Sequence, residues 1–322
     1  MTIESLDITL RPSTLEHYVG QSELKEMLNI YIKTAKKRNE SLDHVLFYGP
    51  PGLGKTTLAH IIANEMNSRL ITTTGASLTR VGDIVSILSG LNEGDILFID
   101  EIHRIPNSVE EILYTAMEDF SIDIIVGNKE STSTFKIDLP PFTLIGATTR
   151  CGDLVQPFRD RFGIVHQLSY YTHFELIEIL KRTSRILNYD IENDAVLELA
   201  KRSRGTPRIA NRLYKRVRDF AEYQEESKIT YKTTCVALDK LKIDCYGLTK
   251  SDQHYLKVLI ERFNGGPVGV SALAHTLNEN LSTIEDVIEP YLLQEGFIQR
   301  SPRGRIATLK AQNHLIIKKG AA

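Results

Sequence analysis

The chain has 322 residues, of which 42% are hydrophobic and 25% charged, and its formal net charge is −2. This composition is ordinary for a globular protein, and the length predicts two or three domains. The start, MTIESLDITLRP, shows no signal peptide, and no apolar run approaches the roughly 18 residues of a membrane span. Three scattered cysteines without CxxC spacing argue against a metal site or a disulfide framework, so we expect a protein of the reducing cytoplasm.

The small net charge conceals an asymmetry. Residues 296–322 contain six basic side chains and no acidic one, so a polyanion is expected to bind there. These basic residues are Arg300, Arg303, Arg305, Lys310, Lys318 and Lys319.

The first predicted helix follows Leu10-Arg11-Pro12. Apolar residues recur there at helical spacing, which predicts an amphipathic helix leading into the next element. They are Leu24, Leu28, Tyr31 and Ala35.

A buried strand is predicted at Val45–Tyr48, and GPPGLGKTT follows it directly. This is the phosphate-loop pattern of Gly, four residues, Gly, Lys, then Ser or Thr. Gly49, Gly52 and Gly54 permit positive φ, so that backbone N–H groups can surround phosphate oxygens at the start of a helix predicted over 55–67. Lys55 is expected to reach the β- and γ-phosphates of ATP, and Thr56 to ligate Mg²⁺. The predicted nucleotide contacts are Gly52, Gly54, Lys55, Thr56 and Thr57.

A second nucleotide signature follows a strand over 70–74 and a helix over 78–91. The apolar strand at Ile96–Ile99 ends in Asp100 and Glu101. We expect Asp100 to hold the metal and Glu101 to act as the general base that deprotonates the attacking water, so the pair predicts hydrolysis rather than binding alone.

A helix over 108–119 precedes a predicted hairpin, with strands at 122–126 and 134–137. Its apolar arm is either a partner-docking surface or an edge packed on its own sheet. A further buried strand within 142–150 ends in Thr148 and Thr149, which could bond the attacking water or the γ-phosphate. Arg159 and Arg161 lie in the next turn, where arginines most often form surface ion pairs.

Beyond residue 172 the strands stop. Four helices are predicted over 174–187, 193–202, 207–224 and 231–241, which favours a small helical bundle. Pro207 is well placed at the start of the third helix, whereas Arg208 in its first turn opposes the helix dipole. A nucleotide phosphate would account for that cation.

The last part reads as helices over 249–263, 270–278 and 282–294 and then strand, turn, strand, which is winged-helix organisation. The third helix carries Glu285, Asp286 and Glu289 and no basic residue, so it is not expected to face phosphates. The hairpin, or wing, is the better DNA contact, and its cations would bind the backbone rather than bases. They are Arg300, Arg303 and Arg305.

The segments GPPGLGKTT, ILFIDEIHR, GATTR, FRDRFG and GTPRIANR, in this order and spacing, resemble the AAA+ ATPases and, within them, the ring-forming motors that migrate Holliday junctions. The resemblance covers nearly the whole chain. It implies an α/β fold with an AAA+ P-loop parallel-sheet core over 1–171, a small helical lid domain over 172–245 and a C-terminal winged-helix domain over 246–322.

The resemblance also implies roles for individual residues. Arg161 matches the arginine finger that reaches the neighbouring subunit's site, and Arg208 matches the sensor on the lid. Leu281 stands where the family usually has an arginine, which removes one of the DNA contacts while Arg300 and Arg305 match the family's others. The remaining nucleotide contacts that the resemblance implies are Leu10, Arg11, Glu118, Asp119, Phe120 and Tyr171.

The implied function is an ATP- and Mg²⁺-dependent DNA translocase that works as a homohexamer ring on double-stranded DNA at Holliday junctions, in recombination and repair. Its implied partners are RuvA, which would dock on the 122–138 hairpin, and the RuvC resolvase. A clamp-loader-like ATPase switch shares the nucleotide site but often lacks a winged-helix tail. A winged-helix transcription regulator would need base-reading residues on the 282–294 helix, and these are missing.

Overall fold

The computed structural model describes residues 9–128 and 131–320. The chain forms two compact units. The first comprises the chain up to Asn188 together with Gly205–Asn211, and the second comprises Tyr189–Arg204 and the chain from Arg212 onward. Within the described residues, every helix is too short or too polar to cross a membrane.

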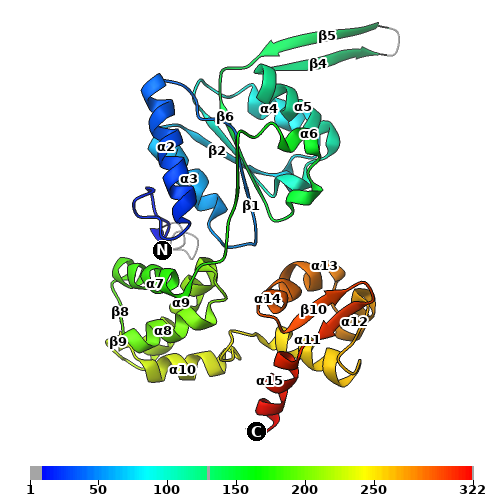
Figure 1. Cartoon of the computed structure of the whole chain (residues 1–322). Helices are drawn as coiled ribbons and strands as arrows, with labels where there is room; N and C mark the ends of the chain where they lie inside the picture. Colours follow the sequence, from blue (N-terminus) through cyan, green and yellow to red (C-terminus); the bar gives the residue numbers. More distant parts are fainter. Residues whose placement is uncertain (1–8, 129–130, 321–322) are drawn as a thin grey trace. The chain divides into compact units, whose positions relative to one another are not determined.

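A five-stranded parallel sheet lies at the centre of the first unit (Figure 1). Its strand order is β2-β3-β6-β1-β7, so β6 lies between the two strands that carry the nucleotide signatures. Because the strands are parallel, their carboxyl ends meet at one edge, where α/β folds bind ligands. The strands are β1 (Val45–Tyr48), β2 (Leu70–Thr74), β3 (Ile96–Asp100), β6 (Thr143–Thr148) and β7 (Ile164–Gln167).

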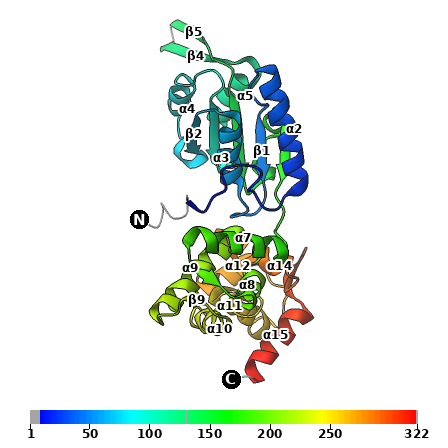
Figure 2. The ribbon, with the colours of Figure 1, turned by 90° about the vertical axis from the view of Figure 1, so that its left-hand side faces the viewer.

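Helices cover both faces of this sheet, α2 and α3 on one and α4, α5 and α6 on the other (Figure 1, Figure 2). The apolar stripe of α2 confirms the first predicted helix, although its third buried residue is Ile32, while Tyr31 is only half-buried. The helices are α2 (Ser22–Arg38), α3 (Lys55–Met66), α4 (Val81–Leu88), α5 (Asn107–Asp119), α6 (Gln156–Arg159) and α7 (His173–Leu187), with short 3₁₀ turns η1 (Gly75–Ser77), η2 (Ile102–Arg104) and η3 (Cys151–Asp153).

The helix predicted over 78–91 is shorter than its apolar spacing suggests. The carboxylate of Asp83 accepts hydrogen bonds from the N–H groups of Thr79 and Arg80, so the helix α4 begins only at Val81. The cap formed by Asp83, and not the hydrophobic period, therefore sets the start of this helix.

The predicted hairpin is present and longer than expected. β4 (Ser121–Asn128) and β5 (Ser131–Asp138) form a separate two-stranded antiparallel sheet that projects from the body of the unit (Figure 1). Among the hairpin side chains that the structure describes, buried Ile122 and half-buried Ile137 at the base join the core. The side chains of Ile124, Ile125 and Val126 lie outside the described residues, but the backbone shows that the hairpin is not an edge of the main sheet.

The helical lid contributes α8, α10 and most of α9 to the second unit. α8 packs against α10, and a two-residue parallel pair joins the loops that precede α8 and α10. The elements are β8 (Asp190–Ile191), α8 (Asn193–Arg202), α9 (Pro207–Tyr223), β9 (Lys228–Ile229) and α10 (Tyr231–Lys240). All four predicted lid helices are therefore present, α7 in the first unit.

The winged-helix domain has its own core around Tyr255, Leu256 and Phe297. Its third predicted helix is divided by a wide π-helical turn, η4, that ends two residues before Pro290, whose ring nitrogen cannot donate a helical hydrogen bond. The terminal helix α15 was not predicted. The elements are α11 (Lys250–Glu261), α12 (Val270–Leu277), α13 (Leu281–Thr283), η4 (Ile284–Ile288), α14 (Glu289–Gln294), β10 (Ile298–Ser301), β11 (Gly304–Ala307) and α15 (Leu309–Gly320).

Candidate nucleotide and DNA sites

The phosphate loop adopts the backbone that its glycines predict. Gly49, Gly52 and Gly54 have φ of 133°, 80° and 105°. A Cβ atom on Gly54 would lie 2.8 Å from the Tyr18 hydroxyl oxygen, and one on Gly49 would lie 2.7 Å from the Leu168 carbonyl oxygen. Both the conformation and the space therefore require glycine, and the loop leads into the N-terminus of α3, where the helix dipole favours an anion.

Lys55 is held inside this loop. Its ammonium donates hydrogen bonds to the carbonyl oxygens of Gly49 (2.7 Å) and Pro50 (2.8 Å). Burial lowers its pKa to about 8, against the opposing attraction of Asp100. A polyphosphate entering the loop would bring a strong anionic partner to this buried cation.

The two signatures meet at the carboxyl edge of the sheet. The Thr56 hydroxyl lies 3.4 Å from Oδ2 of Asp100, and the other carboxylate oxygen of Asp100 accepts the Glu101 N–H at 3.0 Å. A hydroxyl and a carboxylate at this spacing are suitable ligands for Mg²⁺, which keeps several waters and takes few protein ligands. Thr57, the next residue on α3, is half-buried.

Glu101 and the threonines at the end of β6 lie beside this pair. Glu101 has a left-handed φ of 49° and forms a 2.9 Å ion pair with Arg104. Thr148 is buried and its hydroxyl lies 2.9 Å from Nδ1 of His103, whereas Thr149 is exposed one residue past the strand. The structure thus separates a structural threonine from one that is accessible at the edge.

Two tyrosines hold the phosphate loop from outside, and only Tyr171 is among the predicted nucleotide contacts. The hydroxyls of Tyr171 (3.2 Å) and Tyr18 (3.3 Å) both donate to the Leu53 carbonyl, and they lie 2.8 Å from each other. Burial raises the pKa of Tyr171 to about 12. Nothing in the sequence near Tyr18 marks it, because its role depends on a contact 35 residues away.

The start of α9 also reaches the phosphate loop. The Arg208 N–H donates to the Gly52 carbonyl at 3.4 Å. Burial is the main cause of the lowered pKa of Lys55, and the nearby positive charge of Arg208 lowers this pKa further. Leu10 is buried and Arg11 is exposed. The pKa of His60 on α3 is lowered mainly by burial and also by the positive charge of Arg11.

The matched finger lies against α5. Arg161 forms a 2.5 Å ion pair with Glu118, and its guanidinium also bonds the Tyr114 hydroxyl and stacks 4.2 Å from the centre of the Tyr114 ring. Asp119, the residue after Glu118, is exposed, and Phe120 packs against the rings of His44 and Phe142.

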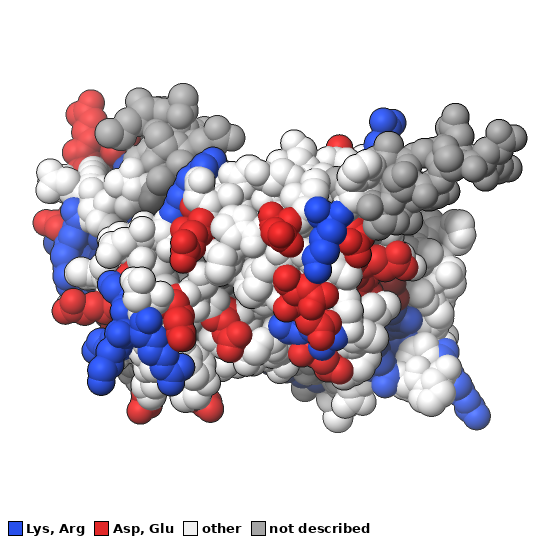
Figure 3. Space-filling model, turned by 90° about the horizontal axis from the view of Figure 1, so that it is seen from above, with Lys and Arg blue, Asp and Glu red and all other residues white. Residues whose placement is uncertain are grey.

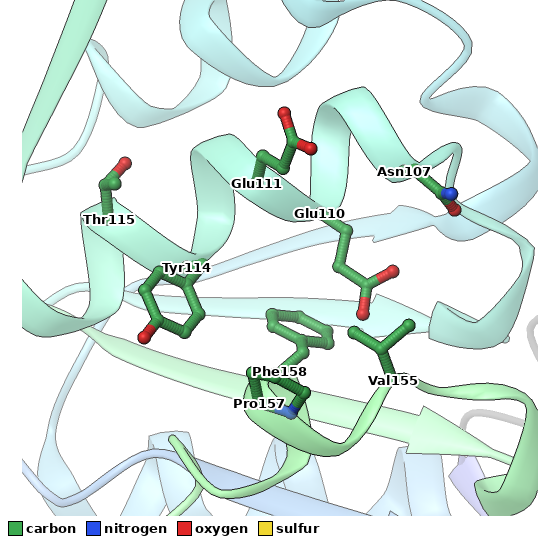
Figure 4. Close-up of a pocket in the computed structure, with 8 residues that line it drawn as sticks. All are labelled: Asn107, Glu110, Glu111, Tyr114, Thr115, Val155, Pro157 and Phe158. Carbon is green, nitrogen blue, oxygen red and sulfur yellow. The ribbon is translucent and has the colours of Figure 1, made fainter.

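A largely apolar cavity of about 380 Å³ lies between α5 and α6 (Figure 4). Tyr114, which holds Arg161, is one of its walls, so the finger and the cavity share a surface. Glu110 points into this cavity, and burial raises the pKa of its carboxyl group.

In the wing, two of the three predicted DNA-binding arginines are engaged with acidic side chains of the divided helix. Glu289 is fully buried and accepts hydrogen bonds from Arg300 (2.7 Å), Arg305 (2.8 Å) and the Tyr255 hydroxyl (3.0 Å). Although burial opposes ionisation, these donors hold the pKa of Glu289 below its ordinary value. Arg305 also pairs with Glu285 at 2.9 Å and is only 14% exposed.

Arg303 differs from its two neighbours in the wing. It is exposed at the turn between β10 and β11. Leu281, where the resemblance expects an arginine, is 46% exposed at the start of α13. Sequence patterning identified the basic wing but not the carboxylates that bind two of its cations.

Comparisons with known proteins agree with this arrangement. Residues 10–168 match the family model "Holliday junction DNA helicase RuvB P-loop domain", residues 171–244 match "RuvB AAA lid domain", and residues 245–316 match "RuvB C-terminal winged helix domain". The chain is 58% identical over 312 residues to the "Holliday junction branch migration complex subunit RuvB" of Acholeplasma laidlawii, covering 97% of this chain and 93% of that protein.

A second relative and a solved structure extend the similarity. The same subunit of Phytoplasma mali is 57% identical over 307 residues, covering 95% of this chain and 92% of that one. The solved "RuvB Holliday junction branch migration motor" of Thermotoga maritima superposes with a TM-score of 0.88 at 48% identity, covering 96% of this chain and 98% of that chain.

Proposed function

The chain belongs to the RuvB family of Holliday junction DNA helicases and is an ATP-binding branch migration motor, and we propose that it cleaves ATP at a seam between neighbouring copies. The observation that supports the seam most strongly is the position of Arg161. It is held by Glu118 and Tyr114 on the surface of α5, whereas Lys55 lies inside the phosphate loop.

The donor set fits MgATP. The positive-φ glycines and Lys55 would hold the phosphates, with Thr57 beside them, and Thr56 and Asp100 would hold Mg²⁺. The ion would neutralise charge on the phosphates. Further nucleotide contacts would come from Leu10, Arg11, Tyr171 and Arg208, and from Glu118, Asp119 and Phe120 of the neighbouring copy.

The protein's own groups can carry out the cleavage. Glu101, released from Arg104, would take a proton from the attacking water, while Thr149 orients that water. Arg161, exchanging Glu118 for the γ-phosphate of the neighbour's nucleotide, would stabilise the charge that develops there. Hydrolysis therefore depends on assembly into a ring, for which we propose six copies.

DNA would be bound through the wing. The face drawn in Figure 3 carries acidic and basic side chains intermingled, without a continuous basic surface among its described residues. Arg303 is exposed and can meet phosphates, Arg300 is half-exposed, and Arg305 is largely committed to Glu289 and Glu285. Contacts of this kind read no bases, as a motor that travels along any duplex requires.

Hairpin β4–β5 is the proposed docking site for RuvA, because it stands apart from the main sheet. RuvC is proposed as a further partner in junction processing, and the cytoplasm as the location. The alternative of a clamp-loader-like switch is not favoured, since the chain carries the matched winged-helix domain.

Branch migration of a synthetic four-way junction, with and without RuvA, tests this function. We expect ATP-dependent migration that RuvA stimulates and that deletion of residues 124–134 makes insensitive to RuvA. ATP hydrolysis without any junction movement would support the clamp-loader-like switch instead.

A further inference from the structure

The five residues 204–208 connect the phosphate loop to the winged-helix domain. At one end, the Gly205 carbonyl accepts the Tyr171 N–H at 2.9 Å, and the Arg208 N–H donates to Gly52 at 3.4 Å. The Thr206 methyl group lies 2.8 Å from where a Cβ of Gly52 would be. Any shift of the phosphate loop must therefore act on this segment directly.

At the other end, Arg204 holds the winged-helix domain. Its Nε donates to the Gly247 carbonyl at 2.7 Å, its Nη2 forms an ion pair with Asp252, and its guanidinium lies 4.7 Å from the centre of the Tyr291 ring. The side chains of Arg204 and Asp252 are 11% and 3% exposed. One guanidinium thus contacts Gly247 in the segment before α11, Asp252 on α11 and Tyr291 on α14.

Asp252 is itself fixed in place by further hydrogen bonds. Its carboxylate also accepts hydrogen bonds from the Thr249 N–H (2.7 Å) and hydroxyl (2.5 Å), which cap the N-terminus of α11. The buried Arg204 guanidinium donates to two separate acceptors and stacks on a ring, and lysine, a point charge on a flexible chain, cannot reproduce this geometry.

The backbone at Arg204 and Gly205 is conformationally restricted. Arg204 and Gly205 both have left-handed φ, of 55° and 63°. A Cβ on Gly205 would lie 3.0 Å from the Tyr170 Cβ. Few conformations are open to a non-glycine residue in this region, so the turn is defined sterically as well as by its contacts.

We propose that Arg204 is a positioning residue that couples the nucleotide site to the DNA-binding domain. Displacement of residues 205–208 during the ATP cycle pulls the Arg204 side chain, and through Asp252 and Tyr291 it moves the winged-helix domain. The proposal rests on the proposed role of Arg208 and its neighbours at the nucleotide, and it assigns Arg204 no contact with either ATP or DNA.

The test is the double variant Arg204→Gln/Asp252→Asn in the full-length protein. Removing both charges avoids leaving one buried and unpaired, and the amide oxygen that replaces the Asp252 carboxylate can still accept from Thr249. ATP turnover in the presence of junction DNA and duplex affinity should stay within twofold of the parent, while base pairs migrated per ATP fall about fivefold or more. Arg204→Lys should likewise reduce base pairs migrated per ATP while leaving turnover and duplex affinity unchanged, since it keeps the positive charge but not the planar guanidinium.

The matched control is Glu192→Gln/Lys228→Gln, which removes a 2.8 Å ion pair inside the lid and should leave migration per ATP unchanged. Unchanged migration per ATP in the Arg204 variants would overturn the proposal, as would a loss of turnover or of DNA affinity that parallels the loss of migration. Failure of the parent protein to migrate junctions would instead reject the proposed function. Full turnover in Arg208→Ala would reject the role of Arg208 at the nucleotide, and with it the coupling through residues 205–208.

Discussion

At the scale of single residues, the phosphate loop was predictable because its chemistry requires a fixed local pattern. Gly49, Gly52, Gly54, Lys55 and Thr56 each take the position that their spacing implies. The residues that support the loop were not predictable. Tyr18 acts through a carbonyl 35 residues away, and Thr148 rather than Thr149 is bound by His103.

Removing the Tyr18 hydroxyl tests the support of the loop. In Tyr18→Phe the Leu53 carbonyl keeps Tyr171 as a donor, so we expect a loss of about 1 kcal/mol in the free energy of unfolding. Urea denaturation measures this directly. Tyr223→Phe, at a tyrosine that is 88% exposed, is the control, and equal stabilities of the two variants would contradict the support role.

The buried Lys55 predicts a pH dependence of stability in the absence of nucleotide. Its pKa of about 8 in the folded protein lies below the ordinary 10.5, so the unfolded chain binds more protons between these values. The penalty is fully present below pH 8, and stability rises as pH increases from 8 toward 10.5.

Comparison with Lys55→Met isolates this effect. Between about pH 7.5 and pH 10 the parent should gain about 2 kcal/mol more unfolding free energy than the variant. Added MgATP should abolish the difference at the lower pH, because phosphate charge stabilises the ammonium. Parallel stability curves for the two proteins would show that Lys55 is not destabilised by burial.

At the scale of elements, the spacing of apolar residues predicted nearly every helix and strand of the motor. The boundaries that this spacing did not predict are set by capping side chains and by proline. Asp83 delays the start of α4, and Pro290 follows the wide turn of η4. The wing was recognised as basic from sequence alone. Its internal neutralisation was not, because Glu289 reaches Arg300 and Arg305 only when the hairpin folds back onto the helix.

The wing arginines should therefore divide into two kinds. Arg303→Ala should weaken duplex binding and reduce the slope of log affinity against log salt by about 1, without a change in thermal stability. Arg305→Ala should lower the unfolding free energy by about 2 kcal/mol, because Glu289 then loses part of its compensation while remaining buried.

Salt titrations and thermal unfolding of the two variants separate these effects, with Arg262→Ala, at an exposed arginine that follows α11, as the control. Equal losses of DNA affinity with no loss of stability would place Arg305 among the exposed phosphate contacts.

At the scale of the whole molecule, the resemblance in the sequence supplied what no single element could, namely the order of a phosphate-loop core, a lid and a winged helix. The matches to the three family models confirm that organisation. The division of the chain into two compact units, which cuts through the predicted lid domain, could not be predicted from the sequence. The start of α9 belongs with the ATPase, while α8, α10 and the winged helix belong together.

The central claim is that ATP is cleaved between copies, with Lys55 from one and Arg161 from the next. Arg161→Ala alone should bind ATP yet lose turnover by about 10³-fold. Lys55→Ala should also be inactive. An equimolar mixture of the two, reassembled on junction DNA, contains seams that pair an intact Lys55 with an intact Arg161.

The ATP turnover of that mixture is the most direct measurement. Random assembly gives an intact seam at about a quarter of the sites, so we predict turnover near that fraction of the parent's. A mixture as inactive as its two components, or an Arg161→Ala protein that hydrolyses ATP at the parent's rate, would contradict cleavage at a shared seam.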